Sequence, residues 1–200
     1  MDHGIELVVI RHLPTVGNGK RQYVGWTDEP IIPSDSAPYD RTIKKVHGSD
    51  LLRTRQTAAL LFPNAAYGAD SRFRECNFGQ FEGKTYAQLE RYSHYRNWVD
   101  DPIGISPPDG ESLQQVQARV LKAFRELPQG AHVVTHGGPI RLLLARFAPE
   151  QREFWSWNVP HGSIYRFHWE SEEQWKEGQR CTSLSVEMRM ENGNSYEKEC

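Results

Sequence analysis

Short apolar segments alternate with helical segments along this chain, and that alternation constrains the fold more than any other feature. The run "IELVVI" at 5–10 is rich in β-branched residues and typical of a strand buried on both faces. A second such strand is predicted at 131–135, in "AHVVT". Further strands are predicted at 42–48, 162–170 and 182–190, and helices at 51–62, 84–98, 111–127 and 139–147. Strands that alternate with helices predict an α/β fold, a three-layer α/β/α sandwich with a mostly parallel central sheet.

Composition favours a soluble globular protein. Charged residues make up 25% of the 200-residue chain, and the net charge of -2 gives no sign of a nucleic-acid or membrane-binding surface. No segment has the length of a membrane span, and the N-terminal residues do not resemble a signal peptide. Three cysteines without metal-like spacing suit free thiols in a reducing cytoplasm. We therefore expect a cytoplasmic monomer or homodimer with one domain over 1–200, of which 192–200 form a frayed tail.

Two histidines follow the two buried strands at the points where those strands end. His12 comes after the strand at 5–10, and His136 comes after the strand at 131–135. Parallel strands end at one edge of a sheet, where α/β proteins bind ligands, so neighbouring strands would bring both imidazoles into one pocket. Arg11 and Arg53 can join them, and the backbone N–H groups of "GG" at 137–138 begin the next helix. Such a cluster of donors predicts a phosphate-binding pocket.

Phosphoryl transfer is the chemistry that these residue types can carry out. A neutral imidazole can attack phosphorus through its free nitrogen, and arginines stabilise the charge on the transferred phosphoryl group. The leaving oxygen needs a proton, for which Glu75 in "FRECNFGQFEG" is the best placed carboxyl group. Glu82, in the same loop, is the alternative. Water would then hydrolyse the phosphohistidine, with the same carboxylate acting as the base.

Five segments resemble, in order, those of the histidine phosphatase superfamily. They are "RHLPTVGN", "SDLLRTRQTA", "FRECNFGQFEG", "GESLQQVQARV" and "VVTHGGPIR", and together they span roughly residues 5–147. The chain is most similar to the branch that contains cofactor-dependent phosphoglycerate mutases, fructose-bisphosphatases and α-ribazole phosphatases. The family usually has glycine where this chain has Leu13.

The resemblance implies a role for each matching residue. His12 would be the phosphorylated nucleophile and Glu75 the proton donor, while Arg11, Arg53 and His136 would hold the phosphoryl group. The remaining implied contacts are Asn18 to phosphate, Gly137 after the second histidine, and Thr15, Tyr23 and Gly25 on the substrate side. The family needs no metal and no organic cofactor, and its substrates here would be small-molecule phosphomonoesters.

Other polar and aromatic residues have simpler interpretations. Arg55 is expected on a solvated helix face, and the remaining histidines on the surface or in the core, with His161 in "VPHGS" the one that could line the pocket. The segment 91–111 is expected to cover the pocket, and its tyrosines and Trp98 suggest a substrate with a ring or an apolar leaving group. The polar stretch at 170–177 is expected to be a solvated turn.

Three classes of function remain open. The first is a phosphatase that uses a phosphohistidine, or a mutase that shares its first half-reaction. A mutase must exclude water, which takes covering segments that a 200-residue chain has little material to build, so hydrolysis is favoured. The second is a metal-dependent enzyme with two histidines and Glu75 as ligands, although nearby arginines would repel the cation. The third is a binding module without catalysis.

Overall fold

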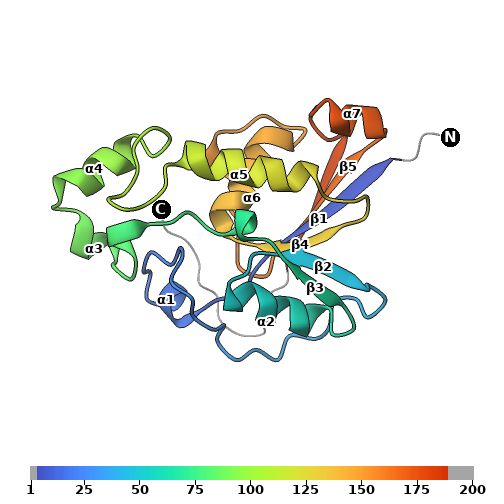
Figure 1. Cartoon of the computed structure of the whole chain (residues 1–200), viewed down its shortest axis with the longest axis horizontal. Coiled ribbons are helices and arrows are strands. Elements are labelled where there is room, and N and C mark those ends of the chain that lie inside the picture. Colours follow the sequence, from blue (N-terminus) through green and yellow to red (C-terminus); the bar gives the residue numbers. More distant parts are fainter. Residues whose placement is uncertain (1–3, 189–200) are drawn as a thin grey trace.

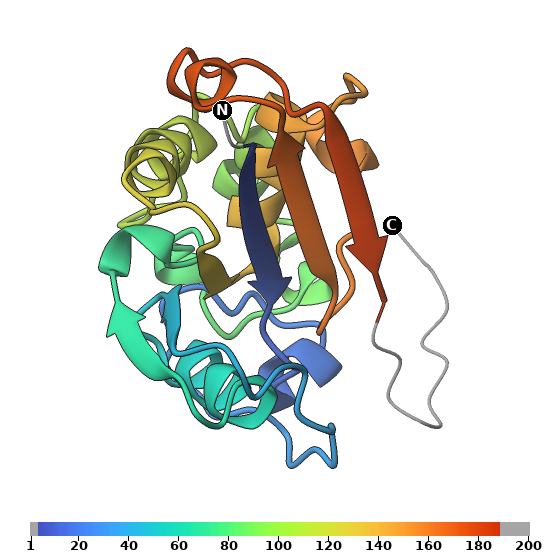
Figure 2. The same ribbon diagram turned by 90° about the vertical axis from the view of Figure 1, so that its right-hand side faces the viewer.

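A sheet of six strands in the order β3-β2-β4-β1-β5-β6 forms the centre of the computed structural model, which describes residues 4–188. The strands are β1 (Ile5–Arg11), β2 (Lys45–Gly48), β3 (Ala66–Ala69), β4 (His132–Thr135), β5 (Ile164–Trp169) and β6 (Ser183–Glu187). The first four pair in parallel, whereas β5 pairs antiparallel with both β1 and β6 (Figure 2). The predicted α/β fold with a mostly parallel sheet is confirmed.

Helices cover both faces of this sheet (Figure 1). They are α1 (Val16–Gly19), α2 (Leu52–Leu61), α3 (Tyr86–Leu89), α4 (Ser93–Asp100), α5 (Leu113–Arg125), α6 (Gly137–Phe147) and α7 (Glu172–Lys176), with short 3₁₀ helices at Ser71–Phe73, Gly79–Phe81 and Phe154–Ser156. One hydrophobic core joins the sheet to α5, α6 and α7, and a second joins its other face to α2. No helix within the described residues is long and apolar enough to cross a membrane.

The apolar run of β1 is continuous because both faces of this strand are buried. Leu7 and Val9 belong to the core beneath α5 and α6, whereas Val8 and Ile10 belong to the core beneath α2. Alternate residues of a strand point to opposite faces, so a strand between two helical layers needs apolar residues at every position. This packing places the carboxyl end of β1 in the middle of the molecule.

Several predicted elements differ from the observed ones. The helix predicted at 84–98 is two helices, α3 and α4, because a new N-terminus forms at Tyr92; Tyr95 and Trp98 of α4 are buried in a separate aromatic cluster. The strand β3 was not expected, and the predicted turn at 170–177 contains α7, whose Trp175 is buried in the core. The predicted frayed tail at 192–200 lies outside the described residues.

Candidate active site

The carboxyl ends of β1 and β4 bring the two predicted histidines together. β1 pairs with β4 so that Arg11 lies opposite Thr135, and the next residue of each chain segment is a histidine. The ring centroids of His12 and His136 are 5.0 Å apart. Both side chains are buried, with exposed fractions of 3% and 0%. The parallel pairing of β1 with β4 therefore brings the two imidazoles together at the carboxyl ends of these strands.

The backbone that follows His12 fixes the protonation pattern of its ring. The Nδ1 atom of His12 lies 2.6 Å from the carbonyl oxygen of Leu13, and because a carbonyl only accepts, Nδ1 carries the proton. The Leu13 N–H in turn donates to Thr57 Oγ1 at 3.0 Å, which anchors this loop to α2. Burial, with the nearby charges of His161, Arg53 and Arg11, lowers the pKa of His12 well below its usual value. The ring is thus neutral, with the lone pair on Nε2.

His136 has the opposite tautomer. Its Nδ1 accepts a hydrogen bond from Arg53 Nε at 3.2 Å, since a guanidinium only donates. In the neutral ring the proton therefore sits on Nε2, which donates to Ser49 Oγ at 2.8 Å. Ser49 lies 2.9 Å from Thr54 Oγ1, and that hydroxyl donates to backbone oxygens at the start of α2. Burial and the Arg53 charge lower the pKa of His136.

The two predicted arginines lie in this pocket without an acidic partner. Arg53, fully buried on the first turn of α2, donates to the carbonyl oxygens of Thr27 at 2.9 Å and Gly25 at 2.6 Å. Arg11 donates to the carbonyl of Val159, while its buried Nε has no partner among the described residues. Desolvation lowers the pKa of Arg11 to about 10. No carboxylate of the described chain forms an ion pair with either guanidinium.

Glu75 lies at the N-terminus of α6, beside the second histidine. Its Oε2 accepts a hydrogen bond from the Gly138 N–H at 3.0 Å, and Oε1 accepts one from its neighbour Cys76 at 2.9 Å. A Cβ atom on Gly138 would lie only 2.2 Å from Oε1, so glycine is needed there for the carboxylate to reach the helix. Burial lowers the pKa values of Arg11 and Arg53, and the nearby charge of Glu75 partly opposes this shift, as expected for a carboxylate close to both guanidinium groups.

Glu82, the alternative proton donor, is occupied elsewhere. Its carboxylate accepts hydrogen bonds from the backbone N–H groups of Gly25, Trp26 and Thr27 at 2.8–3.2 Å. It also accepts from the Thr27 hydroxyl at 2.7 Å and from the Phe78 N–H at 3.0 Å. Glu82 therefore holds the loop whose carbonyls bind Arg53. This arrangement favours Glu75 as the group that exchanges protons with a substrate.

The other residues implied by the family pattern lie around this pocket in different settings. Thr15 and Asn18 form the capping box of α1, and Thr15 also donates to Glu29. Tyr23 belongs to the aromatic cluster of α4, with its hydroxyl 2.6 Å from that of Tyr95. Burial raises the pKa of Tyr23. These three side chains therefore hold the loops beside the histidine pair through contacts with their own neighbours.

Neighbouring atoms lie close to the Cα atoms of both predicted glycines, Gly25 and Gly137. A Cβ on Gly25 would lie 2.0 Å from the carbonyl oxygen of Cys76, so the loop under Glu82 requires glycine. A Cβ on Gly137 would lie within 3.4 Å of both Arg11 and Arg141, which shows that two guanidinium groups converge there. Arg55, by contrast, is exposed and donates to the Asp50 carbonyl, as expected for a solvated position.

Sequence reasoning missed two neighbours of the histidine pair, Ser49 and Arg141, and left open whether His161 lies there. The ring of His161 lies 5.1 Å from that of His12, its Nδ1 donates to the His12 carbonyl at 3.1 Å, and burial lowers its pKa to about 3. His161 therefore lies beside His12 and is largely buried, an outcome that the sequence left open. A signal existed for Arg141, which follows Gly137 by four residues and so shares a helix face with it.

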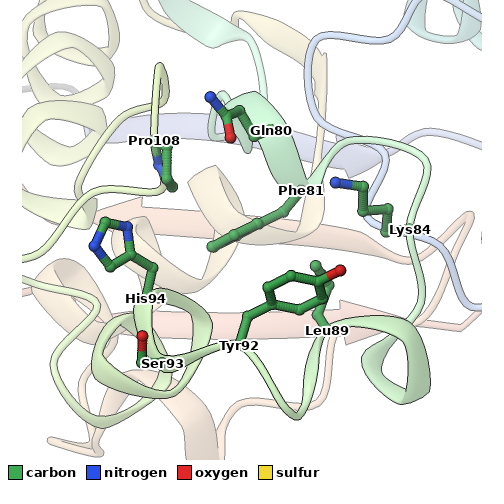
Figure 3. A pocket seen from close by; sticks show the side chains of 8 residues that line it. All are labelled: Gln80, Phe81, Lys84, Leu89, Tyr92, Ser93, His94 and Pro108. Carbon is green, nitrogen blue, oxygen red and sulfur yellow. The ribbon is translucent and has the colours of Figure 1, made fainter.

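Residues 80–89 and the segment 91–111 together line a cavity of about 210 Å³ (Figure 3). Its lining residues are Gln80, Phe81, Lys84, Leu89, Tyr92, Ser93, His94 and Pro108. None of them is a predicted site residue. Trp98 is only 5% exposed and packs on Phe81 and Tyr23, so it supports the loops and offers little surface to a substrate.

Metal coordination was the alternative use of the two histidines and Glu75. Across residues 4–188, no group of three or more histidine, cysteine, aspartate or glutamate side chains is arranged to hold a metal ion. The groups that surround the two imidazoles are instead guanidinium ions, which favour an anion.

The fold and the site define an α/β protein with a cationic, histidine-centred cluster of side chains at the carboxyl ends of its parallel strands. The chain belongs to the histidine phosphatase superfamily (branch 1), whose sequence pattern matches residues 7–181. It is 30% identical over 150 residues to "Probable phosphoglycerate mutase GpmB" of Escherichia coli K12, an alignment that covers 66% of this chain and 70% of that relative.

Solved structures show the same fold. A candidate alpha-ribazole-5'-P phosphatase from Escherichia coli K-12 superposes with a TM-score of 0.73 at 21% identity, covering 98% of this chain and 99% of that one. A phosphoglycerate mutase from Thermus thermophilus superposes with a TM-score of 0.65 at 28% identity, covering 90% and 98%. Relatives with mutase and phosphatase names thus share this fold.

Proposed function

We propose that the protein is a phosphatase that hydrolyses a small-molecule phosphomonoester through a phosphohistidine on His12. The observation that carries this proposal is the fixed tautomer of His12. Its Nδ1 proton is bound by the Leu13 carbonyl, which leaves a neutral Nε2 lone pair near guanidinium groups that form no salt bridge with a described carboxylate. A nucleophile for phosphorus needs that lone pair, and a phosphoryl dianion needs those cations.

In the first half-reaction, Nε2 of His12 attacks phosphorus and the bond from phosphorus to the ester oxygen breaks. Arg11 and Arg53 stabilise the charge on the equatorial oxygens, and His136 completes the pocket. Glu75, in its protonated form, gives its proton to the leaving oxygen, so that the alcohol departs neutral. The products of this step are the alcohol, a Glu75 carboxylate and phosphorylated His12.

In the second half-reaction, the Glu75 carboxylate takes a proton from water while the water oxygen attacks phosphorus. The bond between Nε2 and phosphorus breaks, which releases inorganic phosphate and returns His12 to its neutral form. Glu75 is again protonated, so atoms and charges balance over the cycle. No metal ion takes part in either step of this proposal.

A mutase is the second candidate function, because the curated relative GpmB is named as a probable phosphoglycerate mutase. The two functions share the first half-reaction and differ only in whether water or an alcohol accepts the phosphoryl group. Incubation with a phosphoglycerate separates them: a phosphatase releases inorganic phosphate, whereas a mutase yields the isomeric phosphoglycerate without phosphate release.

The direct test of the proposed function is hydrolysis of p-nitrophenyl phosphate in excess EDTA. The wild-type protein should keep full activity, and His12→Ala should lose on the order of a thousandfold or more, because the attacking atom is removed. His94→Ala, at an exposed position of α4, is the matched control. If His12→Ala folds by circular dichroism and keeps more than a small fraction of activity, the nucleophile is not His12; loss of activity in EDTA would indicate a metal enzyme instead.

A further inference from the structure

Backbone partners hold both ends of the peptide bond that leads into His12. The Arg11 carbonyl accepts a hydrogen bond at 3.1 Å from the N–H of Gly162, which lies in the turn before β5. The His12 N–H donates at 2.9 Å to the carbonyl of Thr135, the last residue of β4. Up to this point the position of the chain is therefore set by the neighbouring backbone, whatever side chains those neighbours carry.

Two side chains take the place of these backbone partners at the next peptide bond, between His12 and Leu13. Its carbonyl oxygen accepts from Nδ1 of His161 at 3.1 Å, and its N–H donates to Oγ1 of Thr57 at 3.0 Å. His161 precedes β5, whereas Thr57 lies on α2, so the two partners come from different elements. Because a trans peptide is planar and directs its C=O and N–H to opposite sides, hydrogen bonds at both ends oppose its rotation.

The orientation of this peptide determines which nitrogen of His12 carries the proton. The next carbonyl along the chain, that of Leu13, lies 2.6 Å from His12 Nδ1. Pro14 follows, and proline restricts the residue before it to extended geometry. With the preceding peptide held at both ends and a proline after it, the Leu13 carbonyl has little freedom to leave the ring. The lone pair on His12 Nε2 thus depends on the partners of the backbone that follows this residue.

His161 can hold the carbonyl without adding a charge beside the nucleophile. Its ring centroid is 5.1 Å from that of His12, in an edge-on arrangement with an interplanar angle of 60°. Burial and the charges of Arg11 and Arg53 lower the pKa of His161 to about 3, so at neutral pH the uncharged ring donates through Nδ1. On the other side, the buried Thr57 hydroxyl donates to the Arg53 carbonyl at 2.7 Å, so its oxygen accepts the peptide N–H.

We infer that His161 is a positioning residue for the proposed nucleophile. Together with Thr57 it clamps the His12–Leu13 peptide, which keeps the Leu13 carbonyl on Nδ1 of His12 and the lone pair on Nε2. The effect of this clamp on the reaction rate rests on the proposed function, because only a nucleophile needs that lone pair. Its effect on the ring does not, since the tautomer can be observed without any substrate.

His161→Asn and His161→Leu form a matched pair that tests the clamp. Their side chains branch at the same atom, and Asn Nδ2 takes the place of the imidazole Nδ1, so only Asn can donate to the carbonyl. In the first turnover of p-nitrophenyl phosphate, His161→Asn should release p-nitrophenol within about threefold of the wild-type rate, whereas His161→Leu should be about tenfold slower, as expected for one lost hydrogen bond.

Binding of the phosphoryl group should not change in either variant. The inhibition constant of inorganic phosphate should stay within about twofold of the wild-type value, because Arg11, Arg53 and His136 are retained. A loss of rate without a loss of phosphate binding is the result expected for a residue that positions the nucleophile. His94→Leu, at an exposed position of α4, is the control and should match the wild-type protein in both measurements.

Nitrogen-15 NMR of histidine-labelled protein measures the tautomer of His12 directly. In the wild-type protein and in His161→Asn at neutral pH, the His12 signals should show the proton on Nδ1 alone. In His161→Leu, part of the proton population should move to Nε2, because the Leu13 carbonyl is no longer held on Nδ1. The signals of His12 are assigned by their absence from the spectrum of His12→Ala.

Thr57→Val tests the other end of the peptide, because it removes the acceptor and keeps the shape of the side chain. Alone it should slow the first turnover about as much as His161→Leu. The double variant should be little slower than either single variant, since both side chains hold one peptide. Circular dichroism shows whether each variant folds, and the comparison at His161 decides the inference if Thr57→Val does not.

Three results would overturn the inference. Equal losses of rate in His161→Asn and His161→Leu would show that the hydrogen-bond donor is not what matters. A wild-type rate and tautomer in His161→Leu would show that the peptide needs no clamp, and losses that multiply in the double variant would assign separate roles to the two side chains. If the wild-type protein hydrolyses no phosphomonoester, the proposed function fails, and the tautomer of His12 in the matched pair still decides the clamp.

Discussion

At the scale of single residues, the site depends on which ring nitrogen carries a proton. Backbone and hydroxyl partners give His12 and His136 opposite tautomers, so one ring presents a lone pair and the other is held in the pocket wall by Arg53 and Ser49. Hydrogen-bond partners also distinguish the two carboxylates of one loop, Glu75 and Glu82. Glu82 is tied to a loop by five hydrogen bonds, whereas Glu75 rests on the Gly138 N–H and faces the arginines.

Glu75→Gln tests the role of the proton donor. The amide cannot protonate a leaving oxygen, so hydrolysis of an alkyl phosphate should fall about a hundredfold or more relative to hydrolysis of an aryl phosphate, whose leaving group needs little protonation. The measurement is kcat/KM for a series of esters that differ in leaving-group pKa. In Glu82→Gln all esters should be affected alike; the assignment is wrong if Glu75→Gln also shows no dependence on the leaving group.

At the scale of elements, the spacing of apolar residues predicted the helices that bury one face and the strands that bury both faces. It therefore found β1, β4, α2, α5 and α6 and, through them, the edge where the histidines meet. It failed where tertiary contacts decide the local structure. Tyr95 and Trp98 of the short helix α4 are buried in the aromatic cluster. The polar segment 170–177 contains α7, and its Trp175 side chain packs in the main core. Arg141 was missed and the place of His161 was left open, because only the fold shows what lies next to Arg11 and His12.

Arg119 of α5 links this helix to the loop that carries Glu75. Arg119 donates to the Glu111 carboxylate at 2.8 Å and to the carbonyls of Arg72, Arg74 and Glu75 at 2.7–2.8 Å. Both side chains of the pair are more than four-fifths buried. The segment that leads to Glu75 is thus tied to α5 through Arg119.

Arg119→Met should lower the free energy of unfolding by about 3 kcal/mol, because it leaves Glu111 and three carbonyl oxygens in a mostly buried site without their donor. Urea denaturation of wild type and variant measures this difference. The corresponding change at Arg152, whose pair with Glu150 is exposed, should have little effect. Similar stability losses in both variants would mean that burial of the Arg119 pair is not what matters.

At the scale of the whole molecule, the fold concentrates neutral histidines at its centre. Burial and neighbouring cations depress the pKa values of His12, His136 and His161, whereas the same side chains take up protons near pH 6.5 once the chain unfolds. Their contribution to stability is therefore complete above about pH 6.5 and is lost as the pH falls below it.

The free energy of unfolding should accordingly decrease between pH 7 and pH 5, by up to about 1.4 kcal/mol per pH unit for each histidine that protonates only on unfolding. Urea titrations at pH 7, 6 and 5 measure this slope. His161→Asn should make this slope shallower by up to about 1.4 kcal/mol per pH unit, because one fewer side chain takes up a proton on unfolding. His94→Asn is the exposed control. A free energy of unfolding that stays constant over this range would contradict the neutral, buried state of these rings.

The central claim, that His12 carries the phosphoryl group between substrate and water, is tested most directly by trapping the intermediate. Glu75→Gln mixed with p-nitrophenyl phosphate and quenched in alkali after milliseconds should contain close to one phosphoryl group per protein, located on His12 by mass spectrometry, because the second step lacks its base. Phosphate release without any phosphorylated His12, or a phosphoryl group on another residue, would contradict the account.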